Sequence, residues 1–230
     1  MRLIITRPRV DAVVLAEKLE ALGHEILFAP VLEIVARDNV EIPNRPWAAL
    51  LLTSANGVRC LPKSRLDGDL RVITVGPQSA AAAREHGFHN VEAHGGDVQG
   101  LAKWICSAMV PNVGSLLYLT GHEISGDLAG LLRDKSYDVS RIETYQAIPT
   151  EILLTENESE MTDGVLLYSP RSARLWVDAT SHRHHSGNLV YYCLSQAVAD
   201  VLPASWKKFV AQQPNEEAMI GLLERPRKGE

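Results

Sequence analysis

Six short turns, each rich in hydroxyl side chains or glycine, are the places in this sequence where chemistry could occur. Each turn comes where an apolar run typical of a strand gives way to a segment typical of a helix. At the carboxyl edge of a parallel sheet, such turns present unpaired backbone N–H groups and the positive end of a helix dipole. The turns are Thr6-Arg7-Pro8, Thr53-Ser54-Ala55-Asn56-Gly57, Gly76-Pro77-Gln78-Ser79-Ala80, Thr120-Gly121, Ser169-Pro170-Arg171-Ser172 and Ser195-Gln196-Ala197.

Two interpretations of these turns are open. Any one of them is explained better by ordinary helix capping, because Ser, Thr and Asn are favoured N-caps in every protein. Six turns of one kind, divided between two domains, instead favour a ligand that carries several negative charges, since helix N-termini bind carboxylates and phosphates.

Other catalytic signatures are missing from the sequence. It contains no dinucleotide-binding, phosphate-loop, zinc-protease or hydrolase motif. The glycines of residues 94–100 are loosely spaced and favour a plain loop over a phosphate site. His182, His184 and His185 lie in a polar stretch bounded by Gly187, and a surface loop is favoured over a metal site.

The bulk properties indicate a globular intracellular protein. The net charge of −5 argues against nucleic acid and anionic membranes as partners, because both attract clustered Lys and Arg. The apolar run at the N-terminus is too short for a signal peptide, and the longest run, residues 47–52, cannot span a bilayer. Cys60, Cys106 and Cys193 form no motif, so reduced thiols in the cytoplasm are expected.

The spacing of apolar residues predicts alternating strands and helices. Residues 3–5 and 25–28 are strand candidates, and between them residues 11–22 show helical spacing that ends before Gly23. This βαβ rhythm recurs to the end of the chain. The predicted fold class is α/β, with parallel sheets covered by helices.

An internal repeat runs through this pattern. The segment "LIITRPRVDAVVLAEKLEALGHEI" is echoed by "LLYLTGHEISGDLAGLLRDKSYDV", and "AALLLTSANGVRCL" with the following strand and helix start is echoed by "GVLLYSPRSARLWV". The order along the chain is first unit, second unit, first unit, second unit. Gene duplication and generic βαβ similarity both remain explanations.

Two segments of different character separate these units. Residues 31–37 and 141–148 alternate apolar and polar side chains, which is typical of half-exposed strands. We expect them to form a two-stranded connector between two domains, residues 1–33 plus 149–230 and residues 38–140. A ligand cleft between the domains is the default expectation for such an arrangement.

Several motifs resemble, in order and spacing, those of the uroporphyrinogen-III synthase family. The resemblance covers nearly the whole chain, and its strength lies in the ordered set. The motifs are "TRP" at residues 6–8, "GHEILFAP" at 23–30, "TSANGV" at 53–58, "VGPQSA" at 75–80, "TYQAI" at 144–148 and "YSPRSA" at 168–173.

The resemblance implies two flavodoxin-like α/β domains joined by a two-stranded β connector. It also implies hydroxymethylbilane as the substrate, and closure of that chain to uroporphyrinogen III with loss of water. Porphobilinogen deaminase is then the expected supplier of the substrate, no cofactor is expected, and a monomer is expected.

The same resemblance assigns roles to individual residues. Tyr145 matches the cleft tyrosine of the family and is expected to assist the departing hydroxyl group, because a neutral phenol can donate a hydrogen bond. Without the resemblance, Tyr145 would be interpreted as a packing residue of a strand. Arg7 either pairs with a substrate carboxylate or is a solvated charge. The other expected substrate-binding residues are Thr53, Ser54, Asn56, Gly76, Gln78, Ser79, Gly121, Ser169, Ser172 and Ser195.

The sequence also departs from the family pattern. Cys193 is expected at the position of the glycine in the second copy of the glycine-containing turn, and Thr120 stands where relatives often have Arg. The main alternative function is a non-catalytic two-domain module that binds an anionic small ligand. A further alternative is an enzyme on a nucleotide-binding version of this architecture, such as a glycosyltransferase, which would need an acidic metal-binding motif such as DxD.

Overall fold

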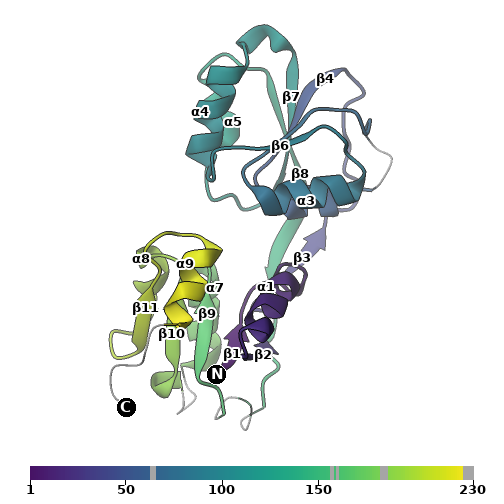
Figure 1. Cartoon of the computed structure of the whole chain (residues 1–230). Helices are drawn as coiled ribbons and strands as arrows, with labels where there is room; N and C mark the ends of the chain where they lie inside the picture. Colours follow the sequence, from purple (N-terminus) through teal and green to yellow (C-terminus); the bar gives the residue numbers. More distant parts are fainter. Residues whose placement is uncertain (63–65, 156–157, 159–160, 182–185, 225–230) are drawn as a thin grey trace. The chain divides into compact units, whose positions relative to one another are not determined.

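The computed structural model describes every residue except 63–65, 156–157, 159–160, 182–185 and 225–230. The chain divides into two compact units. Unit 1 comprises Met1–Glu33 and Ile148–Glu230, and unit 2 comprises Ile34–Ala147. Each unit is built around its own parallel sheet (Figure 1). No helix among the described residues is long and apolar enough to cross a membrane.

Unit 1 contains a five-stranded sheet in the order β11-β10-β9-β1-β2, and all of its strand pairs are parallel. Its central strands are almost entirely apolar, as expected for strands that are covered on both faces. The strands are β1 (Arg2–Ile5), β2 (Glu25–Phe28), β9 (Gly164–Leu167), β10 (Val190–Cys193) and β11 (Lys207–Val210).

Helices cover this sheet. One face is packed by α1 and α9, whose apolar residues join a single core with Leu3 and Ile5 of β1. Ile4, which must point to the other face, is fully buried as well, because successive strand residues alternate between faces. The helices of unit 1 are α1 (Arg9–Ala21), α7 (Pro170–Thr180), α8 (Gln196–Ala199) and α9 (Glu216–Leu223).

The boundaries of α1 differ slightly from the predicted helix at residues 11–22. The helix begins at Arg9 because Pro8 is its N-cap, and it ends at Ala21 with Leu22 as C-cap. Gly23 follows with φ of 81°, a left-handed conformation that glycine adopts without a steric penalty. Glycine at this position therefore stops the helix as the sequence predicts.

Unit 2 contains a six-stranded sheet in the order β3-β8-β7-β4-β5-β6. The pairs from β8 to β6 are parallel. The strands are β3 (Leu32–Ala36), β4 (Trp47–Leu52), β5 (Val72–Thr74), β6 (Val91–Ala93), β7 (Ser115–Gly121) and β8 (Val139–Pro149).

Two apolar cores lie on the two faces of this sheet. Leu51 belongs to the core that α4 and α5 cover, whereas its neighbours Leu50 and Leu52 belong to the core that α2 and α3 cover. Strand β4 is therefore buried on both sides, which explains its unbroken apolar sequence. The helices of unit 2 are α2 (Ala55–Arg59), α3 (Pro77–His86), α4 (Val98–Ala108) and α5 (Leu128–Arg133).

The chain passes from unit 1 to unit 2 within β3 and returns within β8. These two strands are neighbours, and they contain the segments in which a connector is expected. Arg37 N–H donates to the carbonyl of Thr144 at 2.8 Å, and Thr150 N–H donates to that of Val31 at 3.1 Å. Because β8 also pairs with β7, the β3–β8 pair forms one edge of the six-stranded sheet.

The two sheets have the same strand order once the repeated elements are matched. In unit 1 the order is β2-β1-β9-β10-β11, and in unit 2 it is β8-β7-β4-β5-β6, with β3 added at the edge. Matching β1 with β7 and β9 with β4 follows the repeat found in the sequence. This shared topology supports an internal repeat beyond generic βαβ similarity, and the parallel α/β class is confirmed.

Candidate functional site

The carboxyl edge of the unit 2 sheet collects most of the expected site residues. Strands β8, β7, β4 and β5 are consecutive in this sheet. The last three each end at one of the predicted turns, and β8 carries Tyr145 beside the last residue of β7. Carboxyl ends of parallel strands meet at one edge, which is where ligands bind in open α/β sheets. The expected residues at this edge are Thr53, Ser54, Asn56, Gly76, Gln78, Ser79, Gly121 and Tyr145.

Tyr145 is held against the backbone of Gly121. Thr120 pairs with Glu143 and Gly121 pairs with Tyr145, so β8 has one extra residue, Thr144, at this point. Such a β-bulge changes the direction in which the following side chains point. A Cβ atom placed on Gly121 would lie 2.7 Å from Cζ of Tyr145. Only glycine at position 121 leaves room for the phenol ring.

The extra residue has a structural role of its own. The hydroxyl of Thr144 is buried and donates to the carbonyl oxygen of Gly57 at 2.8 Å. Gly57 also lies close to β7, because a Cβ atom there would be 2.9 Å from the carbonyl oxygen of Leu119. These contacts fix the start of α2 against β7 and β8, directly beside the Gly121–Tyr145 contact.

The turn after β4 uses some of its polar groups internally. The Thr53 hydroxyl shares a hydrogen bond of 2.8 Å with the Tyr118 hydroxyl. Ser54 is the N-cap of α2 and accepts from the backbone N–H of Asn56 at 3.3 Å. The side chain of Asn56 is buried and accepts from Arg59. Capping, the simpler of the two interpretations, therefore describes Ser54 in this structure, whereas Asn56 lies inside α2 and is paired with Arg59.

The turn after β5 is more open. Gly76 is the N-cap of α3, and no atom lies within 4 Å of a Cβ placed there. Gln78 is exposed, whereas Ser79 is buried. The glycine at position 76 is thus not required by packing inside unit 2. The free space leaves the backbone of this turn open to a ligand.

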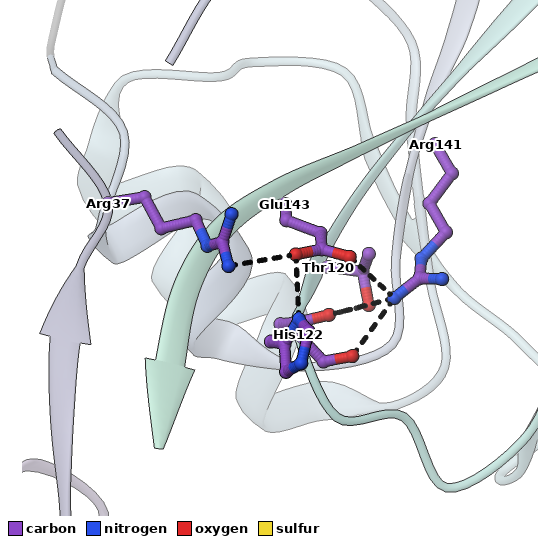
Figure 2. Close-up of polar contacts among 6 residues, drawn as sticks. Arg37, Thr120, His122, Arg141 and Glu143 are labelled. Atoms are coloured by element: carbon purple, nitrogen blue, oxygen red, sulfur yellow. Dashed lines mark hydrogen bonds and ion pairs between the residues drawn. The ribbon is translucent and has the colours of Figure 1, made fainter. Parts of the chain in front are cut away.

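A charged cluster that the sequence analysis missed lies on β8 beside this edge. Glu143 is paired with three basic side chains, as Figure 2 shows. Its Oε2 lies 3.3 Å from Nη2 of Arg37 and 3.0 Å from Nδ1 of His122, and its Oε1 lies 3.2 Å from Nη2 of Arg141. Nη2 of Arg141 also donates to the carbonyls of Gly121 at 3.2 Å and of His122 at 3.1 Å.

Electrostatics keep Glu143 ionised. The hydrogen bond with His122 lowers the pKa of the Glu143 carboxyl below its ordinary value, and the charges of Arg37, His122 and Arg141 lower it further. A carboxylate at this position holds the two guanidinium groups near the backbone of Gly121. The sequence does carry a signal for part of the cluster, since Arg141 and Glu143 are two residues apart in a predicted strand and so share a face.

Unit 1 carries the remaining expected residues at the carboxyl edge of its own sheet. Ser169 is the N-cap of α7 and accepts from the backbone N–H of Ser172 at 3.0 Å, and the two hydroxyls lie 2.8 Å apart. Ser195 is the N-cap of α8, but its side chain makes no capping hydrogen bond. The strands before these turns, β9 and β10, are neighbours.

Arg7 follows β1, the next strand of that sheet. Its guanidinium lies 4.9 Å from the centre of the Tyr168 ring and 3.6 Å from the carboxylate of Glu216. The Tyr168 hydroxyl is buried and has no hydrogen-bond partner among the described residues. Burial raises the pKa of that phenol far above its ordinary value, so it stays neutral. Arg7 is therefore held by Tyr168 and Glu216, and it is not a freely solvated charge.

The predicted place of Cys193 is wrong. Cys193 is the last residue of β10, as Thr74 is the last residue of β5, and it is buried. The counterpart of Gly76 is Ser195, because both are N-cap residues of the following helix. The sequence of the turn alone does not show that β10 ends at Cys193, so it aligns this residue with the glycine of the other turn.

The glycine-rich segment at residues 94–100 and the histidine-rich segment at residues 182–185 are both predicted to be loops. The glycines of residues 94–100 lead into α4, where Asp97 caps the helix by accepting from Gly100 N–H at 2.7 Å. A carboxylate at that helix start disfavours a phosphate. His182, His184 and His185 lie outside the described residues. Elsewhere, the described part of the chain contains no group of three or more His, Cys, Asp or Glu side chains that could hold a metal.

Fold and site together define a class of protein: a parallel α/β chain of two topologically equivalent units, with hydroxyl- and glycine-rich turns at each carboxyl edge. The chain also matches the family model described as Uroporphyrinogen-III synthase HemD, over residues 13–221. It therefore belongs to the uroporphyrinogen-III synthase family, whose members are cyclising hydro-lyases of tetrapyrrole biosynthesis.

Solved structures with this fold are similar over nearly the full length. The uroporphyrinogen-III synthetase of Helicobacter pylori is 16% identical, with 97% of this chain and 98% of that chain covered and a TM-score of 0.66. A mutant uroporphyrinogen III synthase of the extremely thermophilic bacterium Thermus thermophilus is 17% identical, with 98% of each chain covered and a TM-score of 0.53. No curated protein matches the chain.

Proposed function

We propose that this chain closes hydroxymethylbilane to uroporphyrinogen III, with loss of water and inversion of the last pyrrole ring. The observation that carries the proposal is the family match over residues 13–221. The geometry of unit 2 supports it, because a phenol lies at the sheet edge where ligands of open α/β folds bind. The alternative of a non-catalytic binding module is not favoured by the family match.

The first chemical step breaks the C–O bond of the hydroxymethyl group. The electron pair of that bond leaves with oxygen, and the pyrrole nitrogen stabilises the resulting azafulvene. We assign the assistance of this departure to Tyr145, whose neutral phenol can donate to the leaving oxygen. The contact with Gly121 limits the positions that the ring can take. A fixed ring loses little freedom on reaching the geometry of the reaction.

The second step decides which isomer forms. The electrophilic carbon is attacked by the substituted carbon of the last ring, which gives a spiro intermediate that fragments and recloses with that ring inverted. The proton lost at the final closure balances the proton that hydroxide takes up, so the net loss is one water. Spontaneous closure gives the uninverted isomer I. Much of the enzyme's work is therefore to hold one conformation of the bound chain.

Holding that conformation requires anchors for the acetate and propionate groups of the substrate. Backbone N–H groups and hydroxyls at the turns can bind carboxylates in a protein whose net charge is −5. Arg7 offers a charged anchor. We assign the same binding role to Thr53, Ser54, Asn56, Gly76, Gln78, Ser79, Gly121, Ser169, Ser172 and Ser195, of which Gly76 and Ser195 have the fewest internal contacts.

The cellular setting follows from the reaction. The substrate is unstable and needs a nearby source, so we expect porphobilinogen deaminase to supply it. A cytoplasmic monomer is the simplest form of such an enzyme, and size-exclusion chromatography with light scattering checks the monomer directly.

A coupled assay tests the proposed function. Porphobilinogen and porphobilinogen deaminase generate hydroxymethylbilane with or without this protein, and the oxidised porphyrin isomers are separated by chromatography. The protein should shift the product from isomer I to isomer III. If isomer I still dominates at high concentration of a folded protein, the synthase proposal fails and the binding module takes its place.

A further inference from the structure

The Glu143 cluster has the composition of a carboxylate-binding site. Arg37 comes from the chain after β3, His122 follows β7, and Arg141 and Glu143 lie on β8. Three segments that are separate in the sequence thus bring two guanidinium groups and an imidazole to one carboxylate (Figure 2). We propose that Arg37 and Arg141, oriented by Glu143, bind one carboxylate of the substrate at the sheet edge that also carries Tyr145.

The guanidinium groups retain donors for a second carboxylate. Arg37 uses Nη2 toward Glu143, and its Nε and Nη1 have no partner among the described residues. Nη2 of Arg141 serves three oxygen atoms and its Nε is buried, so Nη1, which has no partner among the described residues, is the donor that Arg141 can offer. A guanidinium presents five N–H donors in a fixed plane that matches carboxylate geometry.

The charge of the cluster favours an anion. Two arginines and one glutamate leave one positive charge at this point of a chain whose net charge is −5. The side chains of Arg141 and Glu143 are each 28% exposed. Such partial burial strengthens charge-assisted hydrogen bonds relative to those of fully solvated side chains. One side of the cluster still reaches solvent, because the Arg37 side chain is 41% exposed.

The position of the cluster relates it to the reaction. Arg141 donates to the carbonyl of Gly121, and Gly121 is the residue against which the Tyr145 ring packs. Because Glu143 pairs with Thr120 and Tyr145 pairs with Gly121, the cluster and the phenol lie on the two faces of one sheet edge. A carboxylate bound here therefore anchors the substrate at the edge that carries the phenol. This inference rests on the proposed function, and it adds a charged subsite that orients the substrate at the group that assists the leaving hydroxyl.

A purely structural ion network is the alternative explanation, and unit 2 contains a suitable comparison. Glu92 is paired with Arg71 at 2.5 Å and with His94 at 2.9 Å, while His94 stacks on Trp104. This second cluster has the same residue types, but it lies on the opposite edge strand, β6. Arg45 gives another control, since its 3.3 Å ion pair with Asp138 equals that of Arg37 with Glu143.

The test measures binding of uroporphyrin I, a stable tetrapyrrole with eight carboxyl groups, by isothermal titration calorimetry. Coproporphyrin I, with four carboxyl groups, is the comparison ligand. Arg37→Ala should weaken uroporphyrin binding about 10-fold, because a charge-assisted hydrogen bond is lost. Arg141→Ala should do the same, and Arg45→Ala and Arg71→Ala should leave the affinity unchanged. Coproporphyrin should show a smaller change in each of the first two variants.

Arg141 has internal hydrogen bonds, so its removal could disturb the fold, whereas the side chain of the more exposed Arg37 makes only the ion pair with Glu143 among the described residues. Arg37→Ala is therefore the decisive variant for the carboxylate subsite, and circular dichroism checks that it is folded. In the coupled assay this variant should raise KM about 10-fold and leave kcat unchanged, a split that general destabilisation would not produce.

Each outcome has a definite meaning. A folded Arg37→Ala protein that binds uroporphyrin as tightly as the parent overturns the subsite, even when the parent makes isomer III. Equal losses in Arg37→Ala and Arg45→Ala also overturn it, because nonspecific charge would then explain the binding. If Arg37→Ala alone loses affinity but the parent makes no isomer III, the carboxylate site stands and the synthase function fails.

Discussion

The two units share one topology but differ in what they place at the carboxyl edges of their sheets. After β1, unit 1 has Arg7, which is held by Glu216 and the ring of Tyr168. At the matching position, the last residue of β7, unit 2 has Gly121, which is covered by the ring of Tyr145. The same backbone position thus carries a charge in one unit and leaves space for a phenol in the other.

The strands that follow differ more. In unit 1, β2 ends at Phe28, and Arg9 lies 4.5 Å from the centre of that ring. In unit 2, β8 continues beyond the matching point, bulges at Thr144, and carries both Glu143 and Tyr145. The added length brings the acid and the phenol to a single edge, where Arg37 and Arg141 join them.

This difference suggests a division of labour within a duplicated fold. Unit 2 holds the groups that can assist bond breaking, and the turns of unit 1 hold capped hydroxyls and one arginine suited to anchoring carboxylates. Because the groups that can assist bond breaking lie in unit 2, variants of Gly121 and Tyr145 should lower kcat, whereas variants of the carboxylate anchors, Arg7 in unit 1 and Arg37 in unit 2, should raise KM. Variants in matched positions test that separation.

The largest effect should come from Gly121→Ala. The added Cβ would meet the Tyr145 ring at 2.7 Å and force the phenol out of position. A displacement of about 1 Å can reduce turnover about 100-fold, and kcat in the coupled assay measures it. Gly221→Ala in α9 is the control, since no atom lies within 4 Å of its added Cβ. A Gly121→Ala enzyme with normal kcat would show that the ring contact is unimportant.

Arg7→Ala should have the next largest effect. Loss of a charged anchor in unit 1 should raise KM about 10-fold while kcat stays unchanged, because ground-state and transition-state binding weaken together. Initial rates over a range of deaminase-generated substrate concentrations measure both constants. A fall in kcat with constant KM would place Arg7 in the chemistry and break the proposed division between the units.

Glu143→Gln should destabilise the protein in a pH-dependent way. The folded-state pKa of Glu143 lies below its ordinary value of 4.5, so its ionised form contributes stability that is fully present above that value. The difference between parent and variant, on the order of 1 kcal/mol at pH 7, should disappear as pH falls through the lowered pKa. Urea denaturation at pH 7 and at low pH measures it. A difference that does not change with pH would mean that packing, not charge, is responsible.

The smallest effects should come from the matched helix caps. Ser169→Ala removes a 3.0 Å cap bond and the Ser172 hydroxyl contact from an 11-residue helix, and should cost about 1 kcal/mol. Ser54→Ala removes a 3.3 Å bond from a five-residue helix and should cost about 0.5 kcal/mol. Urea midpoints at unchanged m-value measure both. A larger cost at Ser54 would show that the caps of the two units are not equivalent.

Local sequence patterns predicted the elements well but the site only in part. The strand at residues 25–28, the glycine stop at Gly23 and the repeat could all be predicted, because each depends on neighbouring residues. The Glu143 cluster could not, since Arg37, His122 and Arg141 meet only when β3, β7 and β8 are placed side by side. The bulge at Thr144 could not be predicted from the sequence either, because it depends on how β7 and β8 pair.

The most direct test of the account is the turnover of Tyr145→Phe in the coupled isomer assay. Tyr192→Phe is the matched control, because its hydroxyl lies 4.0 Å from the Met1 sulfur in unit 1 and no role in binding or chemistry is assigned to it. The account predicts that kcat of Tyr145→Phe falls about 100-fold, that KM changes little, and that isomer I increases as spontaneous closure competes. A Tyr145→Phe enzyme with the kcat and isomer ratio of the parent would contradict the assignment of Tyr145 to the reaction.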